Sequence, residues 1–417
     1  MNTFILVAIS FLAPVYAIYV SFSATYYKLI LSPGILYVAL HTIFIHIAAI
    51  DYFLYDPEDN VNFILGSSLG LIFFSFGQIL ALSYYRRSRL KNLFSWPTKM
   101  IIDLKGSTLL KWNIFLFTAI IMSFLFLYIG FQRSGQIPFL NIFKEDSQAY
   151  QEARLNFYRY SGAVALYQFY GVIMPTISVG YLLRFLITNR KKDKIIAMII
   201  IIFTSFCYLA PGHRGPIMIY IIIICIALSY YYNNIPKERL IIVSLLSFII
   251  LYLLTYGGYI TDNEKEYSNI LAVLYNRFFK VQAIGPQFMY SMIPNSWDYY
   301  YGTTFTLDLF GIGKGESFSS IIPKMRVAKS QNNPIGCMTE FYINFGYIGI
   351  IVFTFLWGIV CHIVHIKMMA GSRKITDVAI KSTLIFCLSY ATIAGFIGIF
   401  FQYGLVTLAL MLIIMKL

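Results

Sequence analysis

Long uncharged, apolar runs alternate with short charged segments along the whole chain. A helix needs about 20 apolar residues to cross a bilayer. Uncharged runs occupy 1–27, 29–50, 60–85, 112–132, 160–183, 195–211, 215–236, 240–261, 341–366 and 382–415. The last run would make roughly 51 Å of helix, so we expect it to divide into two helices near Gly395 and Gly398. The pattern predicts an all-α polytopic membrane protein with about 11 transmembrane helices in one integral membrane domain, 1–417.

Composition and charge support this class and set the orientation. The chain is 59% hydrophobic and only 12% charged, whereas soluble proteins are about a quarter charged. The connections 84–111, 184–194 and 367–381 are rich in Lys and Arg, so the positive-inside rule places them in the cytoplasm. The cytoplasmic side then has 20 Lys and Arg against 4 Asp and Glu, and the outer side 12 against 14. The net charge of +14 therefore reflects topology, and we expect no nucleic-acid partner.

Two outer loops are long enough to fold, namely 132–160 and 258–340. The larger opens with Thr261-Asp262-Asn263-Glu264, a capping-box pattern that predicts a helix reaching Lys280. Neither loop has a nucleotide motif or the spacing of a metal site. We therefore expect no cofactor and no metal.

Basic residues on the outer side oppose the positive-inside trend, which makes them candidates for binding an anionic substrate. Arg214 and His213 lie in a tight turn between two spans, so they must sit near headgroup depth beside the N-terminus of the next helix. Arginine is well suited to bidentate phosphate contacts. The alternative for each cation is an interfacial side chain that reaches toward water. The other candidates of this kind are Arg154, Arg159, Arg277, Lys280, Lys324 and Arg326.

Glu340 is the candidate carboxylate. It falls in the first turn of the span after the larger loop, with Asn344 one turn further along the same helix face. The helix dipole alone favours an acid at this place. A functional alternative is a carboxylate at the membrane surface that orients or deprotonates a sugar hydroxyl. The residues leave both explanations open.

Several of these residues belong to a pattern that resembles a known family. The segments are Gly212-His213-Arg214-Gly215, Ile322-Pro323-Lys324 and Pro334-x-Gly336-x-x-x-Glu340-Phe-Tyr342-x-Asn344-Phe-Gly346-x-x-Gly349. With the number of spans and the large outer loop, they resemble the Wzy-type O-antigen polymerases, the oligosaccharide repeat unit polymerase family. The resemblance implies a GT-C-like fold in the bacterial inner (cytoplasmic) membrane, with the active site facing the periplasm.

The activity that the resemblance implies is glycosyl transfer without a metal. A growing glycan would leave its undecaprenyl pyrophosphate carrier and join a new lipid-linked repeat unit, making O-antigen or a related surface polysaccharide. Donor and acceptor lipids, the bilayer and a chain-length regulator are the expected partners. We expect catalytic roles for Glu340, His213 and Arg214. The expected substrate-binding residues are Arg214, Arg277, Lys280, Arg154, Arg159, Lys324, Arg326, Tyr342 and Asn344.

Three alternatives remain open at this point. An O-antigen ligase-like transferase would use the same donor with a lipid A core acceptor. A lipid-linked oligosaccharide flippase would place ionisable groups at the bilayer midplane and repeat its halves. Here the ionisable groups in the middle of predicted spans are few, His41 and His46, and the halves do not repeat. A membrane acyltransferase would also use an intramembrane His.

Overall fold

A computed structural model of the chain gives the architecture. It describes residues 3–25, 31–87, 101–143, 152–153, 156–157, 163–212, 215–232, 275, 279–280, 282–295, 298–301, 335–370, 374–396 and 398–416. Across these ranges the only strand-type pairing is an isolated bridge between Ile101 and Lys374. Nine helices in the described ranges are long and apolar enough to cross a membrane. The prediction of an all-α, multi-pass membrane protein is confirmed.

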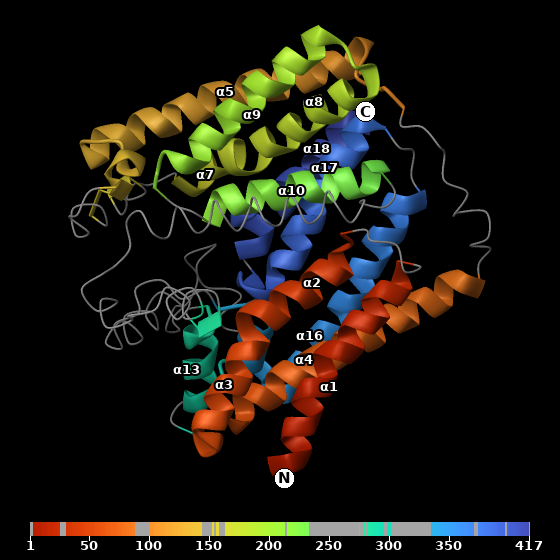
Figure 1. Cartoon of the computed structure of the whole chain (residues 1–417), viewed down its shortest axis with the longest axis vertical. Coiled ribbons are helices and arrows are strands. Elements are labelled where there is room, and N and C mark those ends of the chain that lie inside the picture. The colour runs from red at the N-terminus through yellow and green to blue at the C-terminus, as the bar shows by residue number, and fades with distance from the viewer. Residues whose placement is uncertain are drawn as a thin grey trace.

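The N-terminal helices form one side of the molecule (Figure 1). Helix α1 (Thr3–Ala24) packs along α4 (Pro57–Arg87), and α4 lies against α16 (Cys337–Ala370). Between them in sequence, α2 (Pro33–His41) continues through a π-helical turn, η1 (Thr42–His46), into α3 (Ile47–Tyr55). Ser32 accepts a hydrogen bond from the backbone N–H of Ile35 and so caps the start of α2.

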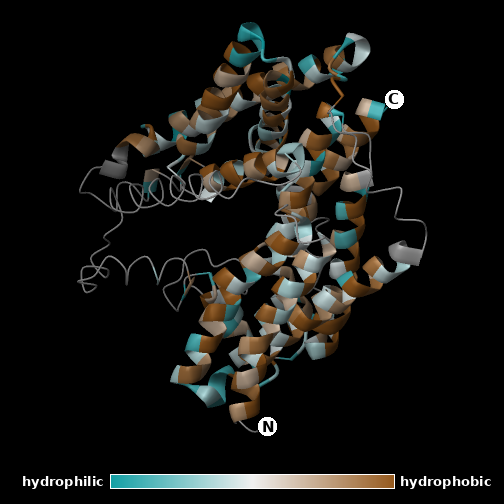
Figure 2. Ribbon diagram, turned by 45° about the vertical axis from the view of Figure 1, so that its right-hand side comes forward, coloured by the Kyte–Doolittle hydropathy of each residue, from teal (hydrophilic) through white to brown (hydrophobic). Residues whose placement is uncertain are grey.

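A second group of helices forms the other side. It comprises α5 (Gly106–Ser134), α7 (Ala163–Tyr167), η4 (Gln168–Ile173), α8 (Met174–Thr188), α9 (Lys191–Leu209) and α10 (Gly215–Tyr232). Helix α17 (Ile375–Ser389) lies between the two groups, since it contacts α2 as well as α8 and α10, and α18 (Leu405–Lys416) packs on α17 (Figure 1). Hydrophobic residues cover most of each helix, with hydrophilic residues gathered toward the ends (Figure 2). This distribution is the one that a lipid environment favours.

The described residues contain most of the spans that the sequence predicts. The run 382–415 divides as expected, because α17 ends at Ser389 and a new apolar helix begins at Gly398. The run 195–211 forms α9, whose first turn holds four charged residues, 191–194; α9 is not among the nine apolar spans. The run 240–261 lies outside the described residues. The described spans therefore number nine where about eleven were expected.

Helix α16 folds back on itself at Gly346. Gly346 has φ 62° and ψ −150°, a conformation that is essentially confined to glycine. A Cβ at Gly349 would overlap the carbonyl oxygen of Phe341, and the rings of Phe341 and Phe353 stack with centroids 4.3 Å apart. In a straight helix these pairs would be separated by roughly 12 and 18 Å. Residues 337–345 are therefore a short half-helix packed beside the long arm, 347–370.

Parts of the two long loops, 132–160 and 258–340, also contact the bundle. Loop 132–160 begins with the last turn of α5 and a 3₁₀ helix, η3 (Pro138–Phe143). Loop 258–340 contributes α13 (Ile284–Met292), which packs on α4 and α16. The helix predicted from the capping box lies outside the described residues except for positions 275, 279 and 280.

Candidate functional site at two helix interruptions

The half-helix 337–345 begins deep in the bundle and runs toward Pro57, the first residue of α4. A Cβ at Gly70, thirteen residues into α4, would overlap the sulfur of Met338, which places Met338 about 20 Å along α4 from its start. At the other end of the half-helix, the Tyr347 hydroxyl donates a hydrogen bond of 2.7 Å to Asn62 Oδ1. The start of the half-helix is thus enclosed within the protein.

A second interruption lies directly against this start. Helix α17 is followed by a 3₁₀ turn, η7 (Tyr390–Thr392), and by the connector 393–396, before a π-helical turn, η8 (Gly398–Gln402), begins. The backbone N–H of Cys337 donates to the carbonyl oxygen of Ala394 at 3.1 Å. A Cβ at Gly336 would overlap the carbonyl oxygen of Thr392. Irregular backbone at this depth requires such enclosure, because lipid offers it no hydrogen-bond partner.

Glu340 is positioned by these two segments. Its Oε2 accepts a hydrogen bond of 2.5 Å from the backbone N–H of Phe396. A Cβ at Gly395 would lie 3.0 Å from the same oxygen, so Gly395 leaves room for the carboxylate. The residue is only 5% exposed, and it forms no ion pair within the described part of the chain. The expectation that Glu340 falls in the first turn of the helix after the larger loop is confirmed. Its side chain is enclosed by protein, and its place at the membrane surface stays a prediction.

Asn344 supports the backbone of the half-helix. Its Nδ2 donates to the carbonyl oxygen of Glu340 at 2.7 Å, so it restrains the main chain at Glu340. Its expected role in binding substrate stays a prediction. The carbonyl oxygens of Ile343 and Asn344 accept hydrogen bonds from the backbone N–H groups of Tyr300 and Tyr301, at 3.0 and 3.2 Å. Loop 258–340 thus satisfies carbonyl groups that the end of a helix leaves unpaired.

Tyr342 lies in the core. It is 1% exposed, its ring stacks on Tyr290 with centroids 4.1 Å apart, and its hydroxyl donates to the carbonyl oxygen of Ile293 at 2.9 Å. The position connects the half-helix to α13. Its predicted contact with substrate stays a prediction, and the described geometry gives the side chain a packing role.

Lys280 is paired with an acid. Its Nζ lies 2.7 Å from Asp51 Oδ2 and over the rings of Tyr52 and Tyr275, 6.0 and 5.7 Å from their centroids. The hydrogen bond to the Asp51 carboxylate raises the pKa of Lys280 above its usual value. The cation expected to bind phosphate is thus already compensated, although both side chains are about a third exposed.

The remaining predicted site residues lie outside the described residues. They are Arg154, Arg159, His213, Arg214, Arg277, Lys324 and Arg326. Their proposed roles toward phosphate stay predictions.

A buried polar chain crosses the first three spans. Ser67 Oγ lies 2.9 Å from His41 Nε2 and 2.8 Å from His46 Nδ1, and His46 Nε2 bonds the carbonyl oxygen of Ser10 at 2.7 Å. The sequence placed the two histidines within spans, but it gave no sign that Ser67 is hydrogen-bonded to both of them. The described residues contain no group of three or more His, Cys, Asp or Glu that could hold a metal ion.

Compared with known protein families, with curated proteins and with solved structures, the chain has no match. The resemblance to the O-antigen polymerases stays a prediction.

Proposed function

We propose that the protein is a GT-C-like membrane glycosyltransferase of the O-antigen polymerase type. It would act on undecaprenyl-pyrophosphate-linked oligosaccharides at the periplasmic face of a bacterial inner membrane. The single observation that carries the proposal is the enclosed Glu340 carboxylate, set between two helix interruptions with a backbone N–H as its hydrogen-bond donor.

A carboxylate inside a membrane domain points to function. Ionisable groups within spans are costly and in general serve binding, transport or catalysis. Here Gly336 and Gly395 make close approaches that bring the connector 393–396 against the half-helix. The arrangement holds one carboxylate oxygen in place and leaves Oε1 without a hydrogen bond from the described residues.

The proposed step uses Glu340 as the general base. Its carboxylate takes the proton from a hydroxyl of the acceptor sugar, and the hydroxyl oxygen attacks the anomeric carbon of the donor. The bond between that carbon and the pyrophosphate oxygen breaks, and its electron pair leaves with undecaprenyl pyrophosphate. Arg214 and Arg277 would stabilise this leaving group, a contribution of roughly 3–4 kcal/mol for one preorganised donor.

The test is reconstitution of the full chain in liposomes with a lipid-linked repeat unit, with polymer length read on a gel. We expect wild type to form a ladder and Glu340→Gln to lose it while still inserting and keeping its thermal stability. Glu58→Gln is the matched control, because Glu58 is an exposed acid in the first turn of α4. A normal ladder from Glu340→Gln would exclude Glu340 as the base.

The interrupted helices and the His41–Ser67–His46 chain favour one second candidate, a lipid-linked oligosaccharide flippase. Transporters commonly bind substrate and coupling ions where helices are broken. The same liposomes distinguish the two, with a lectin added outside to detect glycan that has crossed. A flippase increases lectin-accessible lipid-linked glycan and makes no ladder, whereas a polymerase makes the ladder without transfer across the bilayer.

A further inference from the structure

A polar pocket of about 300 Å³ lies where the first turns of α5 and α17 meet the last turn of α18. Its polar lining comes from Asp103, Ser107, Thr108, Lys111, Lys374, Thr376, Asp377 and Lys416. The pocket belongs to the end of the bundle that the positive-inside rule places in the cytoplasm. We propose that it binds a phosphate group, supplied by an anionic phospholipid of the adjoining leaflet or by inorganic phosphate.

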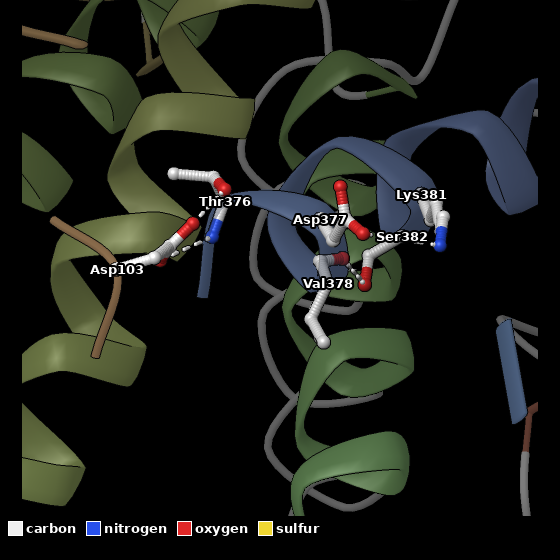
Figure 3. Close-up of polar contacts among 6 residues, drawn as sticks. All are labelled: Asp103, Thr376, Asp377, Val378, Lys381 and Ser382. Carbon is white, nitrogen blue, oxygen red and sulfur yellow. Dashed lines mark hydrogen bonds and ion pairs between the residues drawn. The ribbon is translucent and has the colours of Figure 1, made fainter. Parts of the chain in front are cut away.

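The two acids in the lining are already engaged. Asp103 accepts hydrogen bonds from the backbone N–H of Thr376, at 3.3 Å, and from the Thr376 hydroxyl (Figure 3). It thus caps the start of α17 in place of a local capping side chain. Asp377 lies 3.5 Å from Lys381, one turn further along α17 (Figure 3).

The three lysines in the lining come from three separate elements. Lys111 lies on α5, Lys374 precedes α17 and Lys416 ends α18. None of them forms an ion pair with an acid in the described ranges. The three lysines outnumber the two acids of the lining, and Asp377 is paired with Lys381, so the pocket keeps a positive field that an anion would neutralise.

The start of α5 adds hydrogen-bond donors to this field. The residue before the helix, Lys105, makes no side-chain capping hydrogen bond. The first backbone N–H groups of α5 therefore lack a side-chain acceptor from this position, and the hydroxyls of Ser107 and Thr108 line the pocket beside them. Free N–H groups at a helix start, close to cations, are a common way in which proteins bind phosphate.

Apolar surface next to the pocket fits a lipid as the source. Met415 lines the pocket. Leu110 and Ile114 of α5, and Leu410 and Ile414 of α18, are exposed on helices that contact each other. An acyl chain could lie on this surface while its phosphate occupies the pocket. Basic pockets between membrane helices bind anionic headgroups in this way.

The test is native mass spectrometry of the purified full chain in detergent, with phosphatidylglycerol or phosphatidylcholine added. We expect wild type to retain one phosphatidylglycerol in preference to phosphatidylcholine. The variant Lys111→Gln/Lys374→Gln/Lys416→Gln should bind it at least about 5-fold more weakly, the factor expected for one lysine near the surface. The matched control is Lys191→Gln/Lys192→Gln/Lys194→Gln, which removes three exposed lysines from the start of α9.

Equal loss in the pocket and control variants, or undiminished retention in the pocket variant, would overturn the proposal. A thermal-shift titration with inorganic phosphate separates the two sources. Stabilisation of wild type by phosphatidylglycerol alone assigns the lipid, stabilisation by phosphate alone assigns the free ion, and stabilisation by neither rejects the site. If the triple variant fails to fold, Lys416→Gln at the end of α18 gives the same comparison with one substitution.

Discussion

The carboxylate of Glu340 and the backbone N–H of Phe396 form a hydrogen bond of 2.5 Å across 56 positions of the chain. This bond links the half-helix 337–345 to the connector 393–396. The half-helix ends at the break in α16 at Gly346, and the connector separates α17 from the last helix. Both breaks lie inside the bundle, where unpaired backbone groups are costly. The two interruptions compensate each other, because the N–H of Cys337 also donates to the carbonyl oxygen of Ala394.

The fold of α16 predicts a cross-link that a straight helix forbids. In a background without the five native cysteines, Phe341→Cys and Phe353→Cys should form a disulfide on mild oxidation, because the two rings stack at 4.3 Å. A straight helix would hold these positions roughly 18 Å apart. The readout is a mobility shift on a non-reducing gel after cleavage at an engineered protease site between them.

The control for this cross-link is Ile348→Cys with Val360→Cys, which has the same spacing within the long arm. This pair should stay reduced. Cross-linking of both pairs, or of neither, would contradict the reversal at Gly346.

Gly346→Ala should destabilise the protein. Its φ of 62° and ψ of −150° cost a residue with a Cβ about 1–3 kcal/mol, and that Cβ would lie 3.1 Å from the Tyr299 hydroxyl. Gly215→Ala is the control, since a Cβ at the start of α10 meets nothing within 4 Å. Thermal unfolding in detergent should show a lower midpoint for Gly346→Ala only; equal midpoints would show that the turn tolerates a side chain.

Tyr342→Phe should separate stability from activity. Loss of the hydroxyl leaves the buried carbonyl oxygen of Ile293 without this donor, a cost of about 1–3 kcal/mol. We expect a lower unfolding midpoint with an unchanged polymer ladder, the reverse of the result for Glu340→Gln. A stable Tyr342→Phe protein with a shortened ladder would instead support substrate binding by this tyrosine.

The ion pair between Lys280 and Asp51 predicts a pH dependence. The pKa of Lys280 is raised, so the pair's contribution is complete below the ordinary lysine value of 10.5 and is lost as pH rises through the higher folded-state value. For side chains this exposed, the contribution is about 0–1 kcal/mol. Asp51→Asn should therefore melt slightly below wild type at pH 8, and this difference in melting point should shrink as the pH rises above 10.5.

The control for this pH dependence is Asp59→Asn, which changes an exposed acid in the first turn of α4 that has no ion pair within the described residues. Its melting point should match wild type at pH 8 and above pH 10.5. A difference in melting point between Asp51→Asn and wild type that does not shrink above pH 10.5 would show that Lys280 is not its source.

Several features were readable from the sequence because they depend on local hydrophobicity. The apolar runs predicted the helices, and Gly395 and Gly398 marked the division between α17 and the last helix. Glu340 and Asn344 were found through their helical spacing, and the structure places them one turn apart on the half-helix. Neither pattern indicated that the half-helix was separate from the span that follows it.

Hydrophobicity along the chain determined the class of the protein. A segment in lipid must form its own backbone hydrogen bonds, so it is a helix, and its side chains must be apolar where they face lipid. Tertiary structure alone decided the depth of Glu340 and its hydrogen-bond donor. The reversal at Gly346 depends on φ and ψ at one glycine, and the contact with Phe396 joins residues 56 positions apart. Periodicity does not encode either, because both arise from the packing of segments distant in sequence.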